Sequence, residues 1–196
     1  MRQIEIFFAR HGESVDDLSD SYGGASDFVL SDGGRSQAAE LGKLVEPLGV
    51  QHIFSSPLRR AKETAEIVRG ELTSEVDLTV IPGLRERNTY GLLSGLPKAE
   101  AADIFAYLIE DLEGQPGKDK TCMPGGEEYE PFVGRVLLAW HAVVSACLRD
   151  SLDKVLVVTH GKVTLAMFSE ILHVGDEYDQ SLGALKHVKF TLPHLQ

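Results

Sequence analysis

The stretch QIEIFFARHGES, residues 3–14, passes from an apolar segment directly into an arginine, a histidine and a glycine. Its first seven residues are apolar and rich in aromatic side chains, which is typical of a strand buried on both faces of a parallel sheet. The segment KVLVVTHG, residues 154–161, has the same form, because a second apolar strand ends in His-Gly. Ligands of open α/β sheets bind outside the carboxyl ends of the strands. The sequence therefore predicts that His11 and His160 lie together at one edge of a sheet.

Strand and helix signals alternate along the rest of the chain. Further strands are predicted over residues 52–56, 76–81 and 184–192, and helices over residues 30–49, 57–70, 98–112, 127–150 and 161–172. Pro57 is expected at the first position of the second helix, which would place Arg59 and Arg60 in its first turn. The buried face of the longest helix is predicted to hold Phe132, Val136, Leu137 and Trp140. This order predicts an α/β fold, a three-layer sandwich in which helices cover both faces of a mostly parallel central sheet.

Composition and charge exclude several classes of function. The 196 residues, of which 43% are hydrophobic, are enough for one domain that spans residues 1–196 and buries a full core. The 19 Lys and Arg residues are outnumbered by 30 Asp and Glu residues, and the formal net charge of -11 argues against nucleic acid or an anionic membrane as a partner. No apolar run approaches the ~20 residues of a membrane span and no leader pattern is present, so we expect a cytoplasmic protein. Cys122 and Cys147 lack metal-ligand spacing, and neither a metal nor a cofactor is expected.

Phosphoryl transfer through a phosphohistidine needs no metal, and it uses two histidines, two arginines and a carboxylate. Histidine is largely unprotonated at neutral pH and can act as the nucleophile. Arginine forks bind phosphate oxygens two at a time, and Arg59 and Arg60 lie at a helix start that favours a carboxylate or a bound phosphate. An acid must protonate the leaving oxygen. Glu86, in GLRERNTYG after the third strand, is the carboxylate that we select for this role.

Six segments occur in the order found in one known family: ARHGES, LSDGGRSQA, SSPLRRAKETA, LRERNTYG, PGGEEYEPFVGRV and VVTHG. The chain resembles the histidine phosphatase superfamily, also called the phosphoglycerate mutase-like family, over nearly its whole length. The resemblance implies a phosphoglycerate mutase-like fold, with His11 as the phosphorylated nucleophile and Glu86 as the proton donor. It also implies that Arg10, Arg60 and His160 contact the phosphoryl group.

The pattern R-A-x-x-T-A of this family selects Arg60 over Arg59, because the arginine of the family pocket directly precedes the alanine. We also expect substrate contacts from Asp17, Gly23, Gly24, Lys98 and Lys162. The family usually has asparagine at the position of Asp17, where a carboxylate repels a phosphate dianion unless it is protonated or turned away, and weaker phosphate binding is expected. Lys162 is either an extra cation for a second acidic group on the substrate or a solvated lysine on the first turn of a helix.

Phosphatases and mutases of this family share the core and differ in the segments around it. GLPKAEA, residues 95–101, resembles the stretch in which a lysine of cofactor-dependent phosphoglycerate mutases meets the substrate. The lid-like insertion at about residues 97–126 is much shorter than in those mutases, so water should reach a phosphoenzyme. A metal-independent phosphatase that acts on a small phosphorylated metabolite is therefore the preferred interpretation. A mutase, and a weakly active regulator that binds phosphorylated ligands, stay as alternatives, and monomer and homodimer both stay open.

Overall fold

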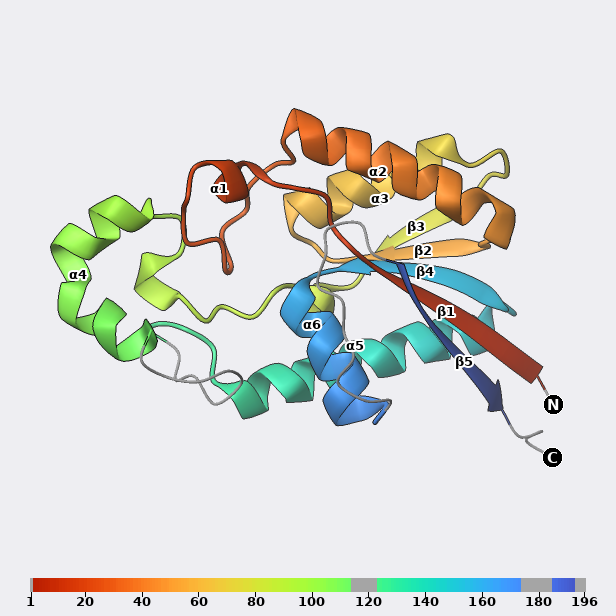
Figure 1. Ribbon diagram of the computed structural model, residues 1–196. Helices are drawn as coiled ribbons and strands as arrows, with labels where there is room; N and C mark the ends of the chain where they lie inside the picture. The colour runs from red at the N-terminus through yellow and green to blue at the C-terminus, as the bar shows by residue number, and fades with distance from the viewer. Residues whose placement is uncertain (1, 114–122, 174–184, 193–196) are drawn as a thin grey trace.

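Five strands form one sheet through the middle of the molecule (Figure 1). The computed structural model describes residues 2–113, 123–173 and 185–192. The strands are β1 (Arg2–Arg10), β2 (His52–Ser55), β3 (Asp77–Val80), β4 (Lys154–Thr159) and β5 (Leu185–Leu192). Their order across the sheet is β3-β2-β4-β1-β5; the first four are parallel, and β5 pairs with β1 in the antiparallel direction. The prediction of a mostly parallel sheet is confirmed.

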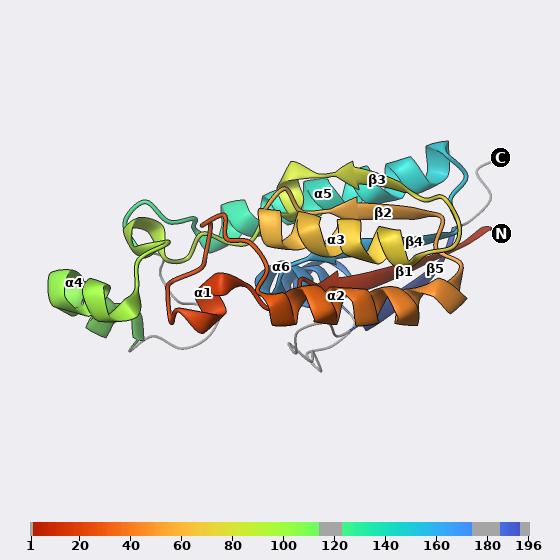
Figure 2. The same ribbon diagram turned by 90° about the horizontal axis from the view of Figure 1, so that it is seen from above.

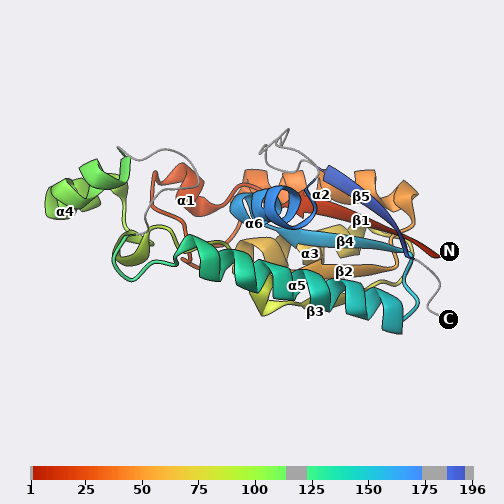
Figure 3. The same cartoon turned by 90° about the horizontal axis from the view of Figure 1, so that it is seen from below.

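Helices cover both faces of this sheet. The four that flank it are α2 (Asp32–Val45), α3 (Arg59–Glu71), α5 (Tyr129–Arg149) and α6 (Gly161–Ala166). Figure 2, seen from above, shows α2 and α3 over the strands, and Figure 3 shows α5 and α6 from below. Phe7 of β1 packs with α2 and α3, whereas Phe8 packs with α5 and α6, which explains why this strand is apolar at successive positions. The predicted three-layer sandwich is confirmed.

One face of α5 is buried in the core. Its buried residues recur with the helical period: Phe132, Val136, Ala139, Val143 and Cys147. The prediction that Leu137 shares this face is wrong, because Leu137 is 40% exposed one position beyond the buried row. Among the described residues, α5 is also the one helix that is long and apolar enough to cross a membrane by length and composition, a test that core helices pass as well.

The parallel pairing of β1 with β4 sets the positions of the residues that follow both strands. Arg10 lies opposite Thr159, and the backbone N–H of His11 donates to the carbonyl oxygen of Thr159 at 3.1 Å. The chain then passes from β4 through His160, the N-cap residue, directly into α6. The predicted helix over residues 161–172 is divided, because α6 is followed by a π-helical turn, Met167–Ile171.

The start of α3 differs from the prediction. The helix begins at Arg59 with Leu58 as its N-cap residue, so Pro57 precedes the helix and does not occupy its first position. The backbone N–H of Arg59 donates to the carboxylate of Asp27 at 2.6 Å. The negative group expected at this helix start is thus present in the chain itself, and Asp27 offsets the cations there.

A third and smaller apolar cluster lies beyond the carboxyl end of the sheet, under α4 (Lys98–Glu113), which stands apart from the strands (Figure 1). Its buried members are Tyr22, Leu93, Ala101, Ile109 and Met123. The short helix α1 (Val15–Leu18) leads toward it, and three-residue 3-10 turns lie at Glu46–Leu48, Pro82–Leu84 and Gly91–Leu93. The start of the predicted insertion is therefore helical, whereas its residues 114–122 lie outside the described residues.

Two glycines let the loop after β1 lie directly against the start of α2. A Cβ atom on Gly34 would overlap the backbone carbonyl of Glu13, and a Cβ atom on Gly12 would overlap the carbonyl of Gly34. Ser31, the N-cap residue of α2, accepts a hydrogen bond from the backbone N–H of Gly34 at 2.9 Å. The loop that carries His11 is thus fixed by backbone contact with α2.

We predict that Gly34→Ala lowers the free energy of unfolding by about 2–3 kcal/mol, because the added methyl group meets backbone that cannot move aside. The matched control is Gly70→Ala in α3, where a Cβ atom would meet nothing within 4 Å. Alanine is the better helix former, so this variant should be as stable as the wild type or more stable by up to about 1 kcal/mol. Urea denaturation of the three proteins makes the comparison, and equal stability of Gly34→Ala and the wild type would contradict the close approach.

Candidate active site

A cavity of about 310 Å³ opens at the carboxyl ends of the parallel strands. Of the ten site residues predicted from the sequence, nine line this cavity. The tenth, His160, has no exposed surface, and its ring lies 5.0 Å from the ring of His11, centroid to centroid. The structure therefore brings together residues that are up to about 150 positions apart in the chain, as expected for an open α/β sheet.

The hydrogen bonds of His11 fix which of its ring nitrogens carries the proton. Nδ1 lies 2.7 Å from the carbonyl oxygen of Gly12, which can only accept, so Nδ1 must donate. Nε2 receives a hydrogen bond from Nε of Arg60 at 3.2 Å, and a guanidinium can only donate. Nε2 of His11 is therefore unprotonated, and its lone pair points to Arg60.

His160 forms the second half of the imidazole pair. Its Nε2 lies 2.7 Å from the hydroxyl oxygen of Ser56, at the end of β2. Its Nδ1 is buried and has no hydrogen-bond partner within the described part of the chain. A buried ring nitrogen without a partner is costly to maintain, and such atoms in a native structure are commonly satisfied by a bound molecule.

Both imidazoles are held in the neutral form. Burial, followed by the positive charge of Arg60, places the pKa of His11 well below its ordinary value. Burial does the same to the pKa of His160, followed by the electrostatic effect of the neighbouring His11 ring and then by the positive charge of Arg60. Each ring therefore retains an unprotonated nitrogen at neutral pH and below.

Arg60 is the arginine of α3 that reaches the cavity. It is 3% exposed, and its terminal nitrogens donate to the carbonyl oxygens of Ser26 at 2.7 Å and Gly24 at 3.1 Å. Burial lowers the pKa of Arg60, although four nearby carboxylates act in the opposite direction. Arg59, one position earlier, is exposed. Arg10, the last residue of β1, lines the cavity beside His11.

Glu86 faces the same cavity from the segment that follows β3. Its Oε1 accepts a hydrogen bond from the backbone N–H of Arg87 at 2.9 Å. Its Oε2 lies 3.4 Å from the backbone nitrogen of Lys162 in the first turn of α6. The carboxylate is therefore held at a defined position by backbone donors of two separate segments.

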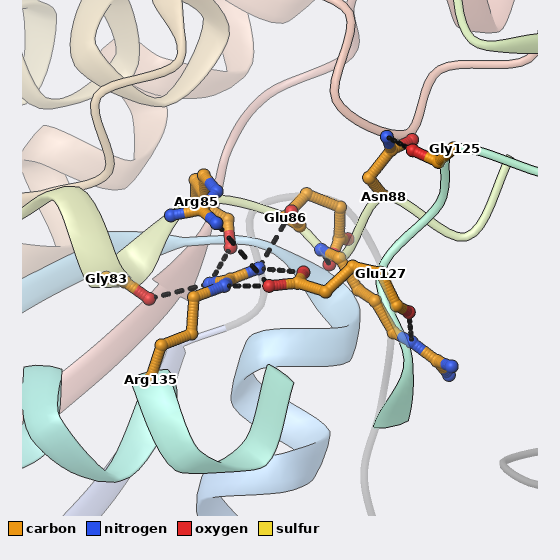
Figure 4. A network of polar contacts seen from close by, with 8 residues as sticks. Gly83, Arg85, Glu86, Asn88, Gly125, Glu127 and Arg135 are labelled. Atoms are coloured by element: carbon orange, nitrogen blue, oxygen red, sulfur yellow. Dashed lines mark hydrogen bonds and ion pairs between the residues drawn. The ribbon is translucent and has the colours of Figure 1, made fainter. Parts of the chain in front are cut away.

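Arg135 of α5 holds the segment that carries Glu86 (Figure 4). Its guanidinium donates to the carbonyl oxygens of Gly83, Arg85 and Glu86 at 2.8, 2.7 and 3.1 Å. It also donates to both carboxylate oxygens of Glu127 at 2.6 Å. Burial acts to raise the pKa of Glu127, but the hydrogen bonds and charge of this guanidinium act in the opposite direction, and that pKa is lowered. Arg135 was not among the site residues predicted from the sequence, because nothing in a helix sequence indicates that one of its arginines reaches three carbonyl groups of another segment.

Comparison with known proteins gives the family. The sequence matches the family model described as "Histidine phosphatase superfamily (branch 1)" over residues 6–191. The chain belongs to this superfamily. A 2,3-bisphosphoglycerate-dependent phosphoglycerate mutase of Gloeobacter violaceus is 31% identical over 179 residues, which cover 88% of this chain and 77% of that protein.

Solved structures share the fold. The phosphoglycerate mutase from Bacillus anthracis matches with a TM-score of 0.78 at 20% identity, over 96% of this chain and 88% of that chain. The alpha-ribazole phosphatase from Shigella flexneri matches with a TM-score of 0.73 at 20% identity, over 94% of this chain and 89% of that chain. The protein is thus a member of an enzyme superfamily that includes both phosphatases and mutases.

Three charged residues predicted as substrate contacts, Asp17, Lys98 and Lys162, already have partners within this protein. Oδ2 of Asp17 accepts from the backbone N–H of Ser14 at 2.9 Å and from its hydroxyl at 3.2 Å, which caps α1. Lys98 pairs with the carboxylate of Asp20. Lys162 donates to the hydroxyl oxygen of Thr89 at 2.7 Å, so it is not a freely solvated lysine.

Asp16 is a cavity residue that the sequence analysis missed. It lines the wall, is 8% exposed, and its Oδ1 has no hydrogen-bond partner within the described part of the chain. A Cβ atom on Gly23 would overlap Oδ2 of Asp16, so the glycine provides room for this carboxylate. An aspartate on a short polar helix next to another aspartate gives no sequence signal of burial, because such residues are normally exposed.

The two neutral imidazoles predict how stability depends on pH. Their pKa values are lowered by folding, so below the ordinary value of 6.5 the unfolded chain binds more protons than the folded chain. The free energy of unfolding should therefore fall as the pH is lowered from 7.5 to 5.5, by at most about 1.4 kcal/mol per pH unit for each histidine.

We expect His160→Asn to remove part of this pH dependence, since one of the two buried imidazoles is lost. The control is His173→Asn, at an exposed residue with φ 51° where asparagine is well tolerated, and it should keep the wild-type dependence. Urea denaturation at several pH values provides the measurement. Equal pH dependence in His160→Asn and the wild type would show that this ring is not held neutral by folding.

Proposed function

We propose that this protein is a metal-independent phosphatase that hydrolyses small phosphate monoesters through a phosphohistidine on Nε2 of His11. The observation that carries the proposal is the unprotonated Nε2, which lies 3.2 Å from a guanidinium nitrogen of Arg60 at the wall of the cavity. An unprotonated nucleophilic nitrogen, next to a cation that matches phosphate oxygens, is the arrangement that attack on phosphorus requires. The cavity of about 310 Å³ fits a phosphoryl group and a short leaving group.

The first step forms a bond between Nε2 of His11 and phosphorus and breaks the ester P–O bond. Glu86 gives its proton to the leaving oxygen, and the alcohol departs. Arg10 and Arg60 bind the non-bridging oxygens, whose charge must be stabilised in the transition state. His160, neutral and buried beside His11, is proposed to donate a hydrogen bond to the same phosphoryl group.

The second step returns the enzyme to its starting state. A water molecule attacks phosphorus, the N–P bond breaks with its electron pair returning to Nε2, and the Glu86 carboxylate takes a proton from the water. Inorganic phosphate then leaves. The sum of both steps is the hydrolysis of a phosphate monoester to an alcohol and phosphate, with no net change in the protein.

Phosphoryl transfer between positions of a substrate, as in a mutase, is the second candidate. It is favoured by relatives such as the phosphoglycerate mutase of Gloeobacter violaceus and by Lys98 in GLPKAEA. Two observations support hydrolysis instead. The ammonium group of Lys98 is paired with Asp20, and the insertion at about residues 97–126 is short, so less of the chain is available to exclude water.

We predict that phosphate release from a panel of phosphate monoesters continues in EDTA and falls by at least about 10³-fold in His11→Ala. The control is His141→Ala, at an exposed histidine of α5, which should keep the wild-type rate. Adding glycerate to the reaction tests the second candidate, because a mutase would transfer the phosphoryl group to it and a phosphatase would release phosphate. Turnover that survives in His11→Ala would refute the assignment of the nucleophile, and no turnover or transfer on any ester would favour a regulator that only binds.

We further predict that Arg135→Lys slows the enzyme selectively on esters with poor leaving groups. Lysine keeps one charge but cannot reach three carbonyl groups and a carboxylate together, so the Glu86 segment should lose its fixed position. The expected result is a fall in kcat of about tenfold or more for an alkyl phosphate and a much smaller fall for p-nitrophenyl phosphate, whose leaving group needs little protonation.

The matched control for this prediction is Arg149→Lys, because Arg149 lies on the same helix and, within the described residues, pairs only with exposed Asp150. It should leave both rates unchanged. If Arg135→Lys slows both substrates equally, Arg135 supports the fold in general and does not position the proton donor.

A further inference from the structure

The carboxylate of Asp16 is a buried negative charge in the cavity wall. It is more than nine-tenths buried, and Oδ1 makes no hydrogen bond within the described residues. Its neighbour Asp17 differs, because Oδ2 of Asp17 accepts two hydrogen bonds from Ser14. A buried carboxylate oxygen without a donor is costly, so an atom that does not belong to this chain is the natural partner for the carboxylate of Asp16.

The cation of the cavity wall that offsets Asp16 is Arg60. Among the carboxylates near this guanidinium, Asp16 raises the pKa of Arg60 the most. On the proposed function, Arg60 binds the phosphoryl dianion, and its positive charge is then matched by the substrate. Asp16 consequently loses its electrostatic partner at the moment when a substrate binds.

The charges of the whole cavity lead to the same result. Four Lys and Arg side chains and three Asp and Glu side chains line it. When a phosphate dianion occupies the two guanidiniums and Glu86 carries the proton that it donates, Asp16 and Asp17 stay negative. Of the two lysines, Lys98 is already paired with Asp20 outside the cavity wall, so the negative charges still exceed the positive ones. A substrate that brought a second negative charge would worsen this balance, whereas a positive charge would correct it.

We propose that Asp16 binds an ammonium group on the alcohol part of the substrate, an inference that rests on the proposed function. The substrates would then be phosphate esters of short amino alcohols. The geometry of the wall supports this placement. Gly23 has no side chain where Oδ2 of Asp16 lies, and both residues line the same cavity as His11. The ammonium would donate to the carboxylate while the phosphoryl group lies at His11 and Arg60.

Three esters of matched length test this inference: 2-aminoethyl phosphate, 2-hydroxyethyl phosphate and carboxymethyl phosphate. They differ at one end only, which is cationic, neutral or anionic. We expect the wild type to hydrolyse the amino ester with a kcat/KM at least about tenfold above that of the hydroxy ester, and the carboxy ester with the lowest value. Asp16→Asn should bring the ratio of the amino ester to the hydroxy ester to within about twofold.

The matched control is Asp77→Asn, because Asp77 is an exposed aspartate on the edge strand β3, and it should keep the wild-type ratio. A wild type that hydrolyses the esters without preference for the amino ester would overturn the proposal. So would an Asp16→Asn variant in which all three esters change by the same factor, since the carboxylate would then act on the phosphoryl group and not on the leaving group.

Calorimetric binding of the three esters to His11→Ala separates this inference from the proposed function. If none of the esters is turned over by the wild type but the amino ester still binds most tightly, and Asp16→Asn removes that difference, the phosphatase assignment fails and the ammonium site stands. If the esters are turned over but the bound state shows no dependence on their charge, the ammonium site fails and the phosphatase assignment stands.

Discussion

The parallel register of β1 and β4 is the constraint on which the rest of the site depends. Arg10 lies opposite Thr159, so both strands deliver a histidine at the next position, and the two imidazole rings meet 5.0 Å apart. A shift of this register by one residue would exchange the two faces of each strand and place Phe7 and Phe8 against the wrong helices. The same apolar packing that stabilises the sheet therefore also fixes the relative positions of His11 and His160.

Burial then determines the chemical state of these residues. Desolvation and the nearby guanidiniums keep both imidazoles neutral, while the carbonyl group of Gly12 and the guanidinium of Arg60 select the tautomer of His11. The protein as a whole carries a formal charge of -11, so on the proposed function the attraction for a phosphate would come from the cations at the cavity, Arg10 and Arg60, and not from the overall field. Carboxylates near Arg60 oppose the effect of burial on its pKa, and on the proposed function they would disfavour substrates with additional negative charge.

The sequence was sufficient for the features that have a local or periodic signal. Apolar runs of strand length predicted the sheet, and His-Gly after two such runs predicted the edge where the cavity lies. The family pattern separated Arg60 from Arg59, and the two residues are indeed buried and exposed, respectively. The errors concern boundaries and faces, as at Pro57, which precedes its helix, and Leu137, which lies just beside the buried row of α5.

The features that the sequence did not predict depend on contacts between distant segments. Arg135 reaches carbonyl groups about fifty positions away, and only the packing of α5 against the sheet brings them together. Asp16 is buried because the chain after α1 folds back over it, and Gly23 leaves the space that its carboxylate fills. Burial of a charged side chain runs against the usual preference of aspartate, so composition and periodicity could not indicate it.

The central claim is that Nε2 of His11 forms the covalent bond to phosphorus. The most direct measurement is phosphorus and nitrogen NMR of the Glu86→Gln variant, labelled with ¹⁵N-histidine, during turnover of p-nitrophenyl phosphate. The leaving group of this substrate needs little protonation, so the phosphoenzyme should still form. Loss of the Glu86 carboxylate slows attack by water, so the phosphoenzyme should accumulate. The account predicts one phosphohistidine, with phosphorus coupled to Nε2 of His11. Phosphorus bound to Nδ1, to His160 or to no histidine at all would contradict it.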